Sequence, residues 1–460
     1  MMLSVPEFFI VFSIIALMVF ECCLALHSRS WVQVYRPTLF VAVILAFYVL
    51  VGPLRAILSA GEVANFIGTS GTIYRETDHR SVLFWGWLGA FIFYGSMLIG
   101  FHCCHLELKP HRLITRTNLH QINRLGQVLC LTGLIPYLVV NGGFIFHRLN
   151  PFAGGSISQV FMNLQGLNIG GFDNYFYLAI NLLIPGIIAQ FAVWLRRRKQ
   201  LWIVLLWLLV ATLIFLSEAF RYRILLLAVP LLLLWFFYCK RRPMLVMLLA
   251  FMFIFVGVNG AIGAARTTMR GLDLERITAQ TPAGLLTASF EEAGVFFTTS
   301  LVIDSVPARF PFIHLEPVYS ALAQPIPRKF FPAKPDGAYA RELPDRIYDV
   351  GYATHTAFLN YAEYYIMFGW ASLVACSVAL GVSLKCLWTW FLWRQYEPLA
   401  QACYLLSASY LFVVVSRGYL PQVFMLYGVT IFPLFVMYWL VSQRSRGLNS
   451  SDIGKNVVSR

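Results

Sequence analysis

The sequence predicts an all-α, polytopic integral membrane protein with about eleven transmembrane helices and a large external loop. Of its 460 residues, 59% are hydrophobic and only 12% are charged, and the mean hydropathy is +0.70. A soluble chain of this length would divide into two or three domains, whereas apolar runs of about 20 residues each cross a bilayer. No Gly/Ser-rich linker and no internal repeat interrupts the pattern. We therefore expect one integral membrane domain over residues 1–460.

The apolar runs give the expected spans in order. The first run has no basic residues before it and reaches the length of a span, so it is interpreted as a transmembrane helix and not as a cleavable signal peptide. The eleven predicted spans are 6–26, 38–58, 82–101, 126–141, 174–195, 201–217, 224–239, 244–263, 366–388, 398–415 and 422–441.

Basic residues orient these spans. The runs "RRRK" (196–199) and "KRR" (240–242), the segment 102–125 and the C-terminal tail all fall on one side of the predicted membrane. Lysine and arginine are enriched in cytoplasmic loops, which places this side in the cytoplasm, the N-terminus outside and the C-terminus inside. The net charge of +14 is thereby explained by membrane topology, and nucleic acid is not an expected partner.

Cysteine and histidine give little sign of a metal or a disulfide. The nine cysteines fall within predicted spans or at their cytoplasmic edges, so a structural disulfide is not expected. The run "HCCH" (102–105) resembles a metal cluster, but adjacent cysteines at the end of a span do not easily close a tetrahedral site. No metal site and no cofactor are predicted.

The polar part of the chain is concentrated in the predicted external loop 264–365. Its segment "GLLTASFEEAGVFFTTSLVID" has the spacing of an amphipathic helix on the membrane surface. Next comes "QPIPRKFFPAKPDG" (324–337), whose four prolines favour extended or polyproline-II backbone. This strip carries Arg328, Lys329 and Lys334 on a stiff backbone, which lowers the cost of ordering an anion clamp. A solvated connector with its cations on lipid headgroups fits the same residues equally well, so both stay open.

Further arginines stand in external turns next to apolar spans. The turns "SEAFRYR" and "SRGYLPQ" each contain arginine, and two more arginines follow the predicted eighth span. An arginine at the membrane costs free energy, so it usually has a partner or a task, and guanidinium forks match phosphate oxygens. Several on one external face indicate a site for a pyrophosphate. These residues are Arg221, Arg223, Arg266, Arg270 and Arg417.

Together these motifs resemble those of the bacterial oligosaccharide repeat-unit polymerases, or O-antigen polymerases. In that family an external loop carries a Pro-Arg…Phe-Pro-x-Lys-Pro strip and re-enters the membrane through an acidic, aromatic segment. The strings "IPRKFFPAKPDG" and "LNYAEYYIMFGW" match this order, and the arginine turns are similar. The resemblance implies an all-helical fold similar to the multi-span lipid-linked-sugar glycosyltransferases, with the active site at the outer surface of the plasma membrane.

The resemblance also implies a reaction. The donor is a growing glycan on undecaprenyl pyrophosphate, and the acceptor is a fresh lipid-linked repeat unit whose hydroxyl attacks the donor's anomeric carbon. Membrane lipids and a chain-length regulator are the other expected partners. No Asp-x-Asp occurs in the chain, so fixed cations, and not a metal ion, are expected to neutralise the leaving pyrophosphate.

The attacking hydroxyl needs a general base. His355 and Glu363 are eight residues apart in one expected helix and so share a face. Histidine has the more suitable ordinary pKa, whereas Glu363 matches the family's acidic position and its pKa would rise on burial. Both remain candidates. Four neighbouring tyrosines are candidates for stacking on sugar rings, although tyrosine at the interface is expected in any membrane protein. They are Tyr352, Tyr361, Tyr364 and Tyr365.

Two other functions remain open on the sequence. A glycan ligase, which moves finished polymer from undecaprenyl pyrophosphate to another acceptor, would use nearly the same site. A polysaccharide flippase or transporter is the alternative from a different class. Transporters tend to show internal repeats with broken helices at mid-membrane, and this chain shows neither, since its polar mass is gathered in one external loop.

Overall fold

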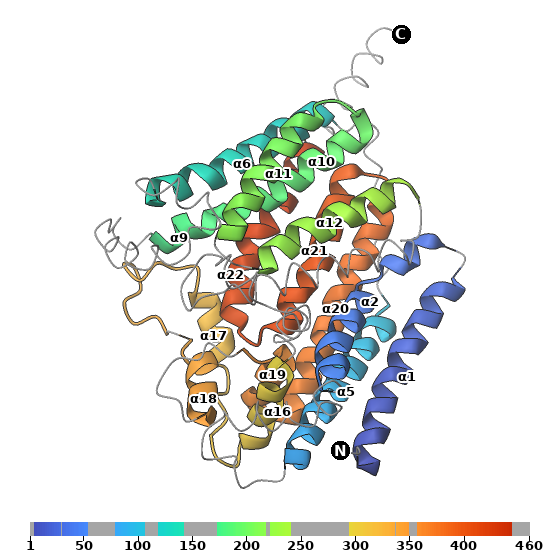
Figure 1. Ribbon diagram of the computed structural model, residues 1–460, viewed down its shortest axis with the longest axis vertical. Helices are drawn as coiled ribbons and strands as arrows, with labels where there is room; N and C mark the ends of the chain where they lie inside the picture. The colour runs from blue at the N-terminus through green and yellow to red at the C-terminus, as the bar shows by residue number, and fades with distance from the viewer. Residues whose placement is uncertain are drawn as a thin grey trace, which may run out of the picture. The chain divides into compact units, whose positions relative to one another are not determined.

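The computed structural model (Figure 1) describes a protein built from helices. The described residues are 4–28, 30–53, 79–105, 118–141, 173–217, 221–240, 294–335, 337–348 and 357–443. Every secondary-structure element in these ranges is a helix, which confirms the predicted all-α class for this part of the chain.

Among the described residues, seven helices are long and apolar enough to cross a membrane. The same residues include four shorter apolar helices. Three of them coincide with the expected spans 38–58, 201–217 and 224–239, and the fourth lies in the expected external loop. The predicted span 244–263 lies outside the described residues, so the number eleven stays a prediction. The seven candidate spans are Val5–His27, Val82–Cys103, Leu119–Val139, Tyr175–Arg197, Trp370–Arg394, Pro398–Ser416 and Leu420–Gln443, and the shorter helices are Pro37–Val51, Leu201–Ser217, Tyr222–Tyr238 and Val295–Ser305.

Contacts divide the chain into two compact units, each made of segments far apart in sequence. The expectation of a single integral domain stays a prediction. The first unit is Met1–Glu107, Phe290–Trp388 and Leu411–Met425, and the second is Leu108–Ser289, Thr389–Tyr410 and Leu426–Arg460.

The first unit contains the N-terminal helices and the C-terminal part of the predicted external loop. Three helices continue from one unit into the other, and they are α20 (Trp370–Arg394), α21 (Pro398–Ser416) and α22 (Leu420–Thr430). The remaining helices of the first unit are α1 (Val5–His27), η1 (Trp31–Tyr35), α2 (Pro37–Leu45), η2 (Ala46–Val51), α5 (His79–Cys103), α16 (Val295–Ser305), α17 (Glu316–Ala323), α18 (Tyr339–Tyr348) and α19 (Asn360–Phe368), with the start of α22 (Leu420–Thr430).

Helix α16 is the centre of the first unit, where it contacts α5, α18 and α19. All of its residues except Val295 and Asp304 are buried. Its hydroxyl side chains return hydrogen bonds to carbonyls one turn earlier, such as Ser300 Oγ to Phe296 O at 2.9 Å, which removes the cost of burying them. The described part of this segment is a helix, but the prediction that it lies on the membrane surface is wrong, because it is buried in the core of the first unit.

Helices α5 and α20 approach each other at two glycines. A Cβ added at Gly100 would overlap the carbonyl oxygen of Val378, and one added at Gly381 would overlap the carbonyl oxygen of Met97. Small residues allow this close contact, which favours helix association where lipid removes the hydrophobic drive.

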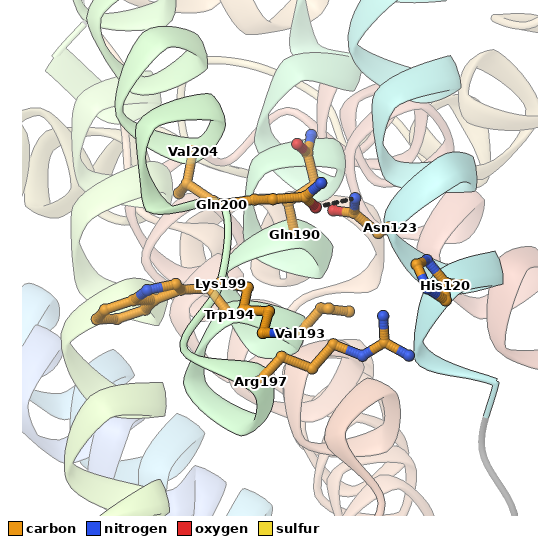
Figure 2. A pocket seen from close by; sticks show the side chains of 9 residues that line it. All are labelled: His120, Asn123, Gln190, Val193, Trp194, Arg197, Lys199, Gln200 and Val204. Carbon is orange, nitrogen blue, oxygen red and sulfur yellow. Dashed lines mark hydrogen bonds between the residues drawn. The ribbon is translucent and has the colours of Figure 1, made fainter.

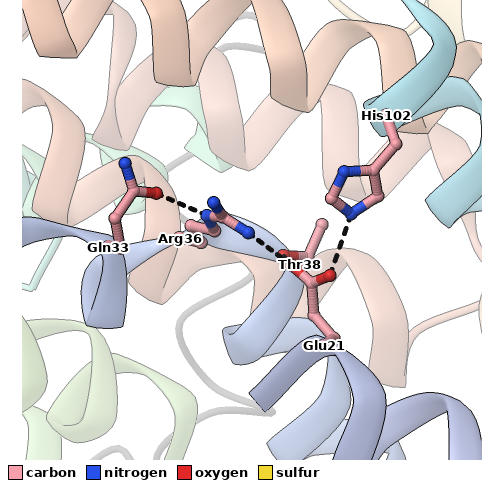
Figure 3. A network of polar contacts seen from close by, with 5 residues as sticks. All are labelled: Glu21, Gln33, Arg36, Thr38 and His102. Carbon is pink, nitrogen blue, oxygen red and sulfur yellow. Dashed lines mark hydrogen bonds and ion pairs between the residues drawn. The ribbon is translucent and has the colours of Figure 1, made fainter. Parts of the chain in front are cut away.

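A polar cluster joins α1, α2 and α5 (Figure 3). The carboxylate of Glu21 is fully buried, accepts a hydrogen bond from Thr38 Oγ1 at 2.5 Å, and lies 2.8 Å from His102 Nε2. Arg36 reaches the same carboxylate at 3.6 Å and donates its Nε–H to Gln33 Oε1. The cluster satisfies a charge that would otherwise be costly to bury, and it occupies His102 of the "HCCH" run.

The second unit is centred on α10, which contacts α6, α11 and α12. Arg223 in the first turn of α12 is buried, and its guanidinium carbon lies 5.5 Å from the centre of the Tyr177 ring. The helices of this unit are α6 (Leu119–Asn141), α9 (Asp173–Leu178), η6 (Ala179–Leu182), α10 (Leu183–Arg197), α11 (Leu201–Ser217) and α12 (Arg221–Tyr238), with the end of α20, the beginning of α21 and the continuation of α22.

Candidate functional site

The residues expected to form the site are distributed over both units. Glu363, Arg417 and the strip cations Arg328, Lys329 and Lys334 belong to the first unit. Arg223 belongs to the second unit, where aromatic rings of Tyr177, Phe215 and Tyr222 surround its guanidinium. Arg221 begins α12, and its side chain is outside the described part. His355, Arg266 and Arg270 lie outside the described residues.

Helix α19 carries Glu363 and begins later than expected. The backbone of Leu359 is extended (φ −73°, ψ 154°), and the helix runs from Asn360 to Phe368. The prediction of one helix from His355 to Glu363 is therefore wrong, because residues 357–359 are not helical. Leu359 N–H donates to Thr299 Oγ1 of α16 at 2.8 Å, so the buried core helix fixes the start of α19.

Glu363 is a buried carboxyl group with two donors on one oxygen. Its Oε1 accepts hydrogen bonds from Tyr339 O–H at 2.5 Å and from the backbone N–H of Leu420 at 2.8 Å. The side chain is 2% exposed. Burial raises the pKa of Glu363 to about 7, and the two hydrogen bonds only partly oppose this rise. Glu363 can therefore exchange a proton near neutral pH.

Tyr339 holds Glu363 from the side of α18. Burial and the neighbouring Glu363 carboxyl raise the pKa of Tyr339, so its hydroxyl keeps its proton and is the donor of their hydrogen bond. The Tyr339 ring packs edge-on against Tyr419, with centroids 5.9 Å apart. Gly337 has a φ of +61°, and a Cβ there would press on the Tyr419 ring, so the chain entering α18 needs glycine at this point.

The turn between α21 and α22 is the third segment of the candidate site, beside α19 and α18. Gly418 N–H donates to Phe358 O at 2.6 Å, and a Cβ at Gly418 would overlap the Phe358 ring. Leu420 is the first residue of α22, so Glu363 also binds one of the free N–H groups at the start of that helix. The turn is thereby attached to α19 on both sides of Tyr419.

Arg417 is the cation that this turn holds near α19. Its neighbour Gly418 contacts Phe358, and its side chain is half-buried. Within the described ranges, no hydrogen bond or ion pair occupies the guanidinium group of Arg417. Its donors are therefore available to an anionic ligand.

The tyrosines on α19 have another task than the one expected. Tyr361 is fully buried and donates its O–H to Gly86 O at 3.1 Å, and Tyr365 is buried with its O–H donated to Val306 O at 3.0 Å. The expectation that these two rings stack on sugars is wrong, because both are packed in the core of the first unit.

The proline-rich strip is folded into successive tight turns. Ile326 N–H donates to Ala323 O, Phe330 N–H to Pro327 O, and Lys334 N–H to Phe331 O. The predicted extended or polyproline-II backbone is therefore wrong. Proline fixes its own φ at a value that early turn positions also use, so the same residues permit turns.

Lys334 closes these turns and is not displayed as a free cation. Its Nζ donates to Gln324 O at 2.6 Å and to Ile326 O at 3.1 Å, and Arg328 donates to Lys334 O at 3.2 Å. Burial and the neighbouring Arg328 guanidinium lower the pKa of Lys334. Lys329 is exposed. The strip is thus a closed loop whose two outward cations are Arg328 and Lys329.

Replacing Lys334 by methionine is expected to loosen the strip. The change removes two hydrogen bonds to backbone carbonyls, each charge-assisted, and should speed amide exchange at Phe330 and Lys334 about tenfold. Hydrogen–deuterium exchange measured by mass spectrometry tests this. The matched control Lys329→Met should leave the exchange unchanged, and equal rates in both variants would show that Lys334 does not close the loop.

Three features of the site were missed from the sequence: Tyr339, Tyr419 and the backbone N–H of Leu420. Tyrosine is common at membrane interfaces, so neither tyrosine carried a signal of its own. The helix start at Leu420 is preceded by "SRG", and the glycine was the available sign that another segment packs on this turn.

Comparisons with known proteins found no match to the chain among protein-family models, curated proteins or solved structures.

Proposed function

We propose that this protein polymerises undecaprenyl-pyrophosphate-linked oligosaccharide repeat units into a surface polysaccharide, such as an O-antigen, a capsule or an exopolysaccharide. It would act at the outer face of the bacterial plasma membrane, with eleven spans, the N-terminus outside and the C-terminus in the cytoplasm. The observation that carries the proposal is the buried Glu363, whose pKa of about 7 suits a general base, beside the turn that presents Arg417.

The proposed chemistry is a glycosyl transfer. Glu363 takes the proton of the acceptor hydroxyl while that oxygen forms a bond to the donor's anomeric carbon. The bond from this carbon to the lipid pyrophosphate breaks, and the pyrophosphate leaves as an anion. Arg417 is placed to bind its oxygens, because a guanidinium fork fits phosphate geometry. No cofactor is needed, since the energy comes from the pyrophosphate ester itself.

Tyr339 has a positioning role in this proposal. Its O–H and the Leu420 N–H both bind Glu363 Oε1. Because both donors stabilise the ionised carboxylate, they keep the pKa of a buried acid from rising beyond the neutral range. The strip next to α18 supplies Arg328 and Lys329 as further cations on the same unit.

The test is turnover of purified protein with synthetic lipid-linked repeat units. A ladder of lipid-linked glycans in steps of one repeat unit, formed also in the presence of EDTA, is the expected result. Transfer of a preformed polymer to a different acceptor, without such a ladder, would assign the chain to the ligases. Movement of intact lipid-linked units across a vesicle membrane without new glycosidic bonds would assign it to the transporters.

A further inference from the structure

The run "RRRK" at the end of α10 separates into two pairs of cations with different surroundings. Arg198 stacks on Trp194, Trp235 and Tyr238, with its guanidinium carbon 5.0–5.4 Å from the three ring centres. Arg196 lies over the Tyr238 ring and donates to Tyr396 O at 3.0 Å. These two arginines are therefore held by aromatic rings and by a carbonyl, as structural groups.

The alternate cations, Arg197 and Lys199, line a pocket of about 440 Å³ in the second unit (Figure 2). A preference for basic residues in cytoplasmic loops explains a positive run, but it does not explain a cavity beside it. The described residues that line the pocket include no carboxylate. They come from α6, from α10, from the segment 198–200 and from α11, and they are His120, Asn123, Gln190, Val193, Trp194, Arg197, Lys199, Gln200 and Val204.

Gln190 is a buried polar residue in the wall of this pocket. The side chain is 1% exposed, and its amide nitrogen is directed to Gly186 O at 3.3 Å and Cys130 Sγ at 3.4 Å. Its Oε1 accepts no hydrogen bond from the described residues. This oxygen has almost no accessible surface, so Gln190 closes the wall of the pocket and is not reached by a ligand inside it.

The loop that presents Lys199 has an unusual backbone. Arg198 and Gln200 both have positive φ, 55° and 64°, which is costly for residues other than glycine. Asn123 Nδ2 donates to Gln200 Oε1 at 3.2 Å, which joins this loop to α6 across the pocket. Cations and carboxamides are thus brought to one cavity from three chain segments.

We propose that this pocket binds a phosphate ester that carries free hydroxyl groups. Arg197 and Lys199 bind the phosphate oxygens, and a ligand hydroxyl donates to the exposed Gln200 Oε1. The volume exceeds the need of a bare ion, and the carboxamides of Asn123 and Gln200 suit a polyol. The same chemistry is found in a soluble sugar or glycerol phosphate and in a phosphatidylglycerol headgroup. This site is independent of the polymerase proposal, because none of its residues belongs to the candidate active site.

The experiment measures binding of three probes to the full chain in phosphatidylcholine nanodiscs. The probes are inorganic phosphate and glycerol 3-phosphate, titrated by calorimetry, and phosphatidylglycerol added to the nanodisc, with retained lipid counted by native mass spectrometry. We expect saturable binding of glycerol 3-phosphate, tighter than that of inorganic phosphate, or selective retention of phosphatidylglycerol. The first result identifies a soluble ligand and the second a lipid headgroup.

Matched variants separate the pocket from general attraction of anions. Arg197→Gln and Lys199→Gln should each weaken binding of the probe about tenfold, because each removes a charge-assisted hydrogen bond. Arg196→Gln removes the same charge from the same run but does not line the pocket, and it should change affinity less than twofold. Gln200→Met should weaken glycerol 3-phosphate binding while leaving that of inorganic phosphate unchanged.

Two results would overturn the proposal. One is equal weakening by Arg196→Gln and Arg197→Gln, which would mean that the run attracts anions only through its total charge. The other is no binding of any probe to the wild-type protein. If Arg197→Gln does not fold, Lys199→Gln carries the same comparison, since Lys199 lies in the loop and not in the helix.

Discussion

Replacing Glu363 by glutamine is expected to abolish polymer formation almost completely, with a loss of about 10²–10⁴-fold in turnover. Glutamine keeps an oxygen that can accept from Tyr339 O–H and Leu420 N–H, so the contacts to α18 and α22 persist while the base is removed. The readout is the ladder of lipid-linked glycans. Glu342→Gln is the matched control, because Glu342 is an exposed carboxylate on α18 paired with Arg346.

The pH dependence of the wild type tests the same residue. A general base works only when it is deprotonated, so activity should rise with pH through about 7, the raised pKa of Glu363. The residual activity of Glu363→Gln should lack this rise. A wild-type profile that is flat between pH 5 and pH 8, or a fully active glutamine variant, would leave Glu363 as a purely structural group.

Stability gives a readout of Glu363 that does not depend on the enzymatic proposal. A carboxyl group whose pKa is raised on folding adds stability below its unfolded value of 4.5, and this contribution is lost as the pH rises through about 7. The loss amounts to about 3 kcal/mol for a shift of this size. The Tm difference between Glu363→Gln and wild type should therefore increase, in favour of glutamine, from pH 5 to pH 8. Glu342→Gln should show no such trend.

Replacing Arg417 by alanine should have the next largest effect, a loss of about 10²–10³-fold in polymer formation. The reason is that the turn carrying Arg417 is held by the Gly418 contact to Phe358, next to α19, and that a guanidinium group can bind the leaving pyrophosphate of the proposed reaction. Lipid-linked single repeat units should accumulate in cells that carry the variant. Arg417→Lys should restore little activity, because an ammonium group cannot form the bidentate fork.

The control for Arg417 is Arg346→Ala. Arg346 belongs to the same unit, is 65% exposed on its side chain and pairs with Glu342 on the surface. Its loss should change neither chain length nor yield, since exposed ion pairs contribute little. Normal polymer from the Arg417→Ala variant would contradict this prediction and would mean that Arg417 only binds lipid headgroups.

The helical class of the fold was predictable because hydropathy measures the property that a bilayer requires of a helix. The environment of α16 was not. Its threonines and serines suggest a polar face, but Thr299, Ser300 and Ser305 return their hydroxyl hydrogen bonds to the preceding turn and are buried. Single residues do not reveal whether such a hydroxyl is satisfied by water or by its own helix.

Two residues of the candidate site, Glu363 and Arg417, were predicted from the sequence, but their arrangement was not, and their roles stay predictions. Glu363 and Arg417 were each identified from their chemistry at a membrane edge, yet nothing in the sequence indicates that Leu420 N–H would meet Glu363. The proline-rich strip 324–337 is a case in which the sequence restricts the backbone but does not determine the side-chain contacts. Its prolines restrict the backbone, but they do not determine that Lys334 turns inward to the carbonyls of Gln324 and Ile326.

The hydrogen bond from Leu420 to Glu363 makes one carboxylate serve two purposes. In the proposed reaction Glu363 takes a proton at each glycosyl transfer, and a neutral carboxylic acid is a weaker acceptor for the N–H at the start of α22 than a carboxylate. Each transfer would then briefly loosen the turn that carries Arg417, at the moment when the spent pyrophosphate must depart. The proton taken up in the chemical step would thus also favour departure of the pyrophosphate and would set the interval between successive additions of repeat units.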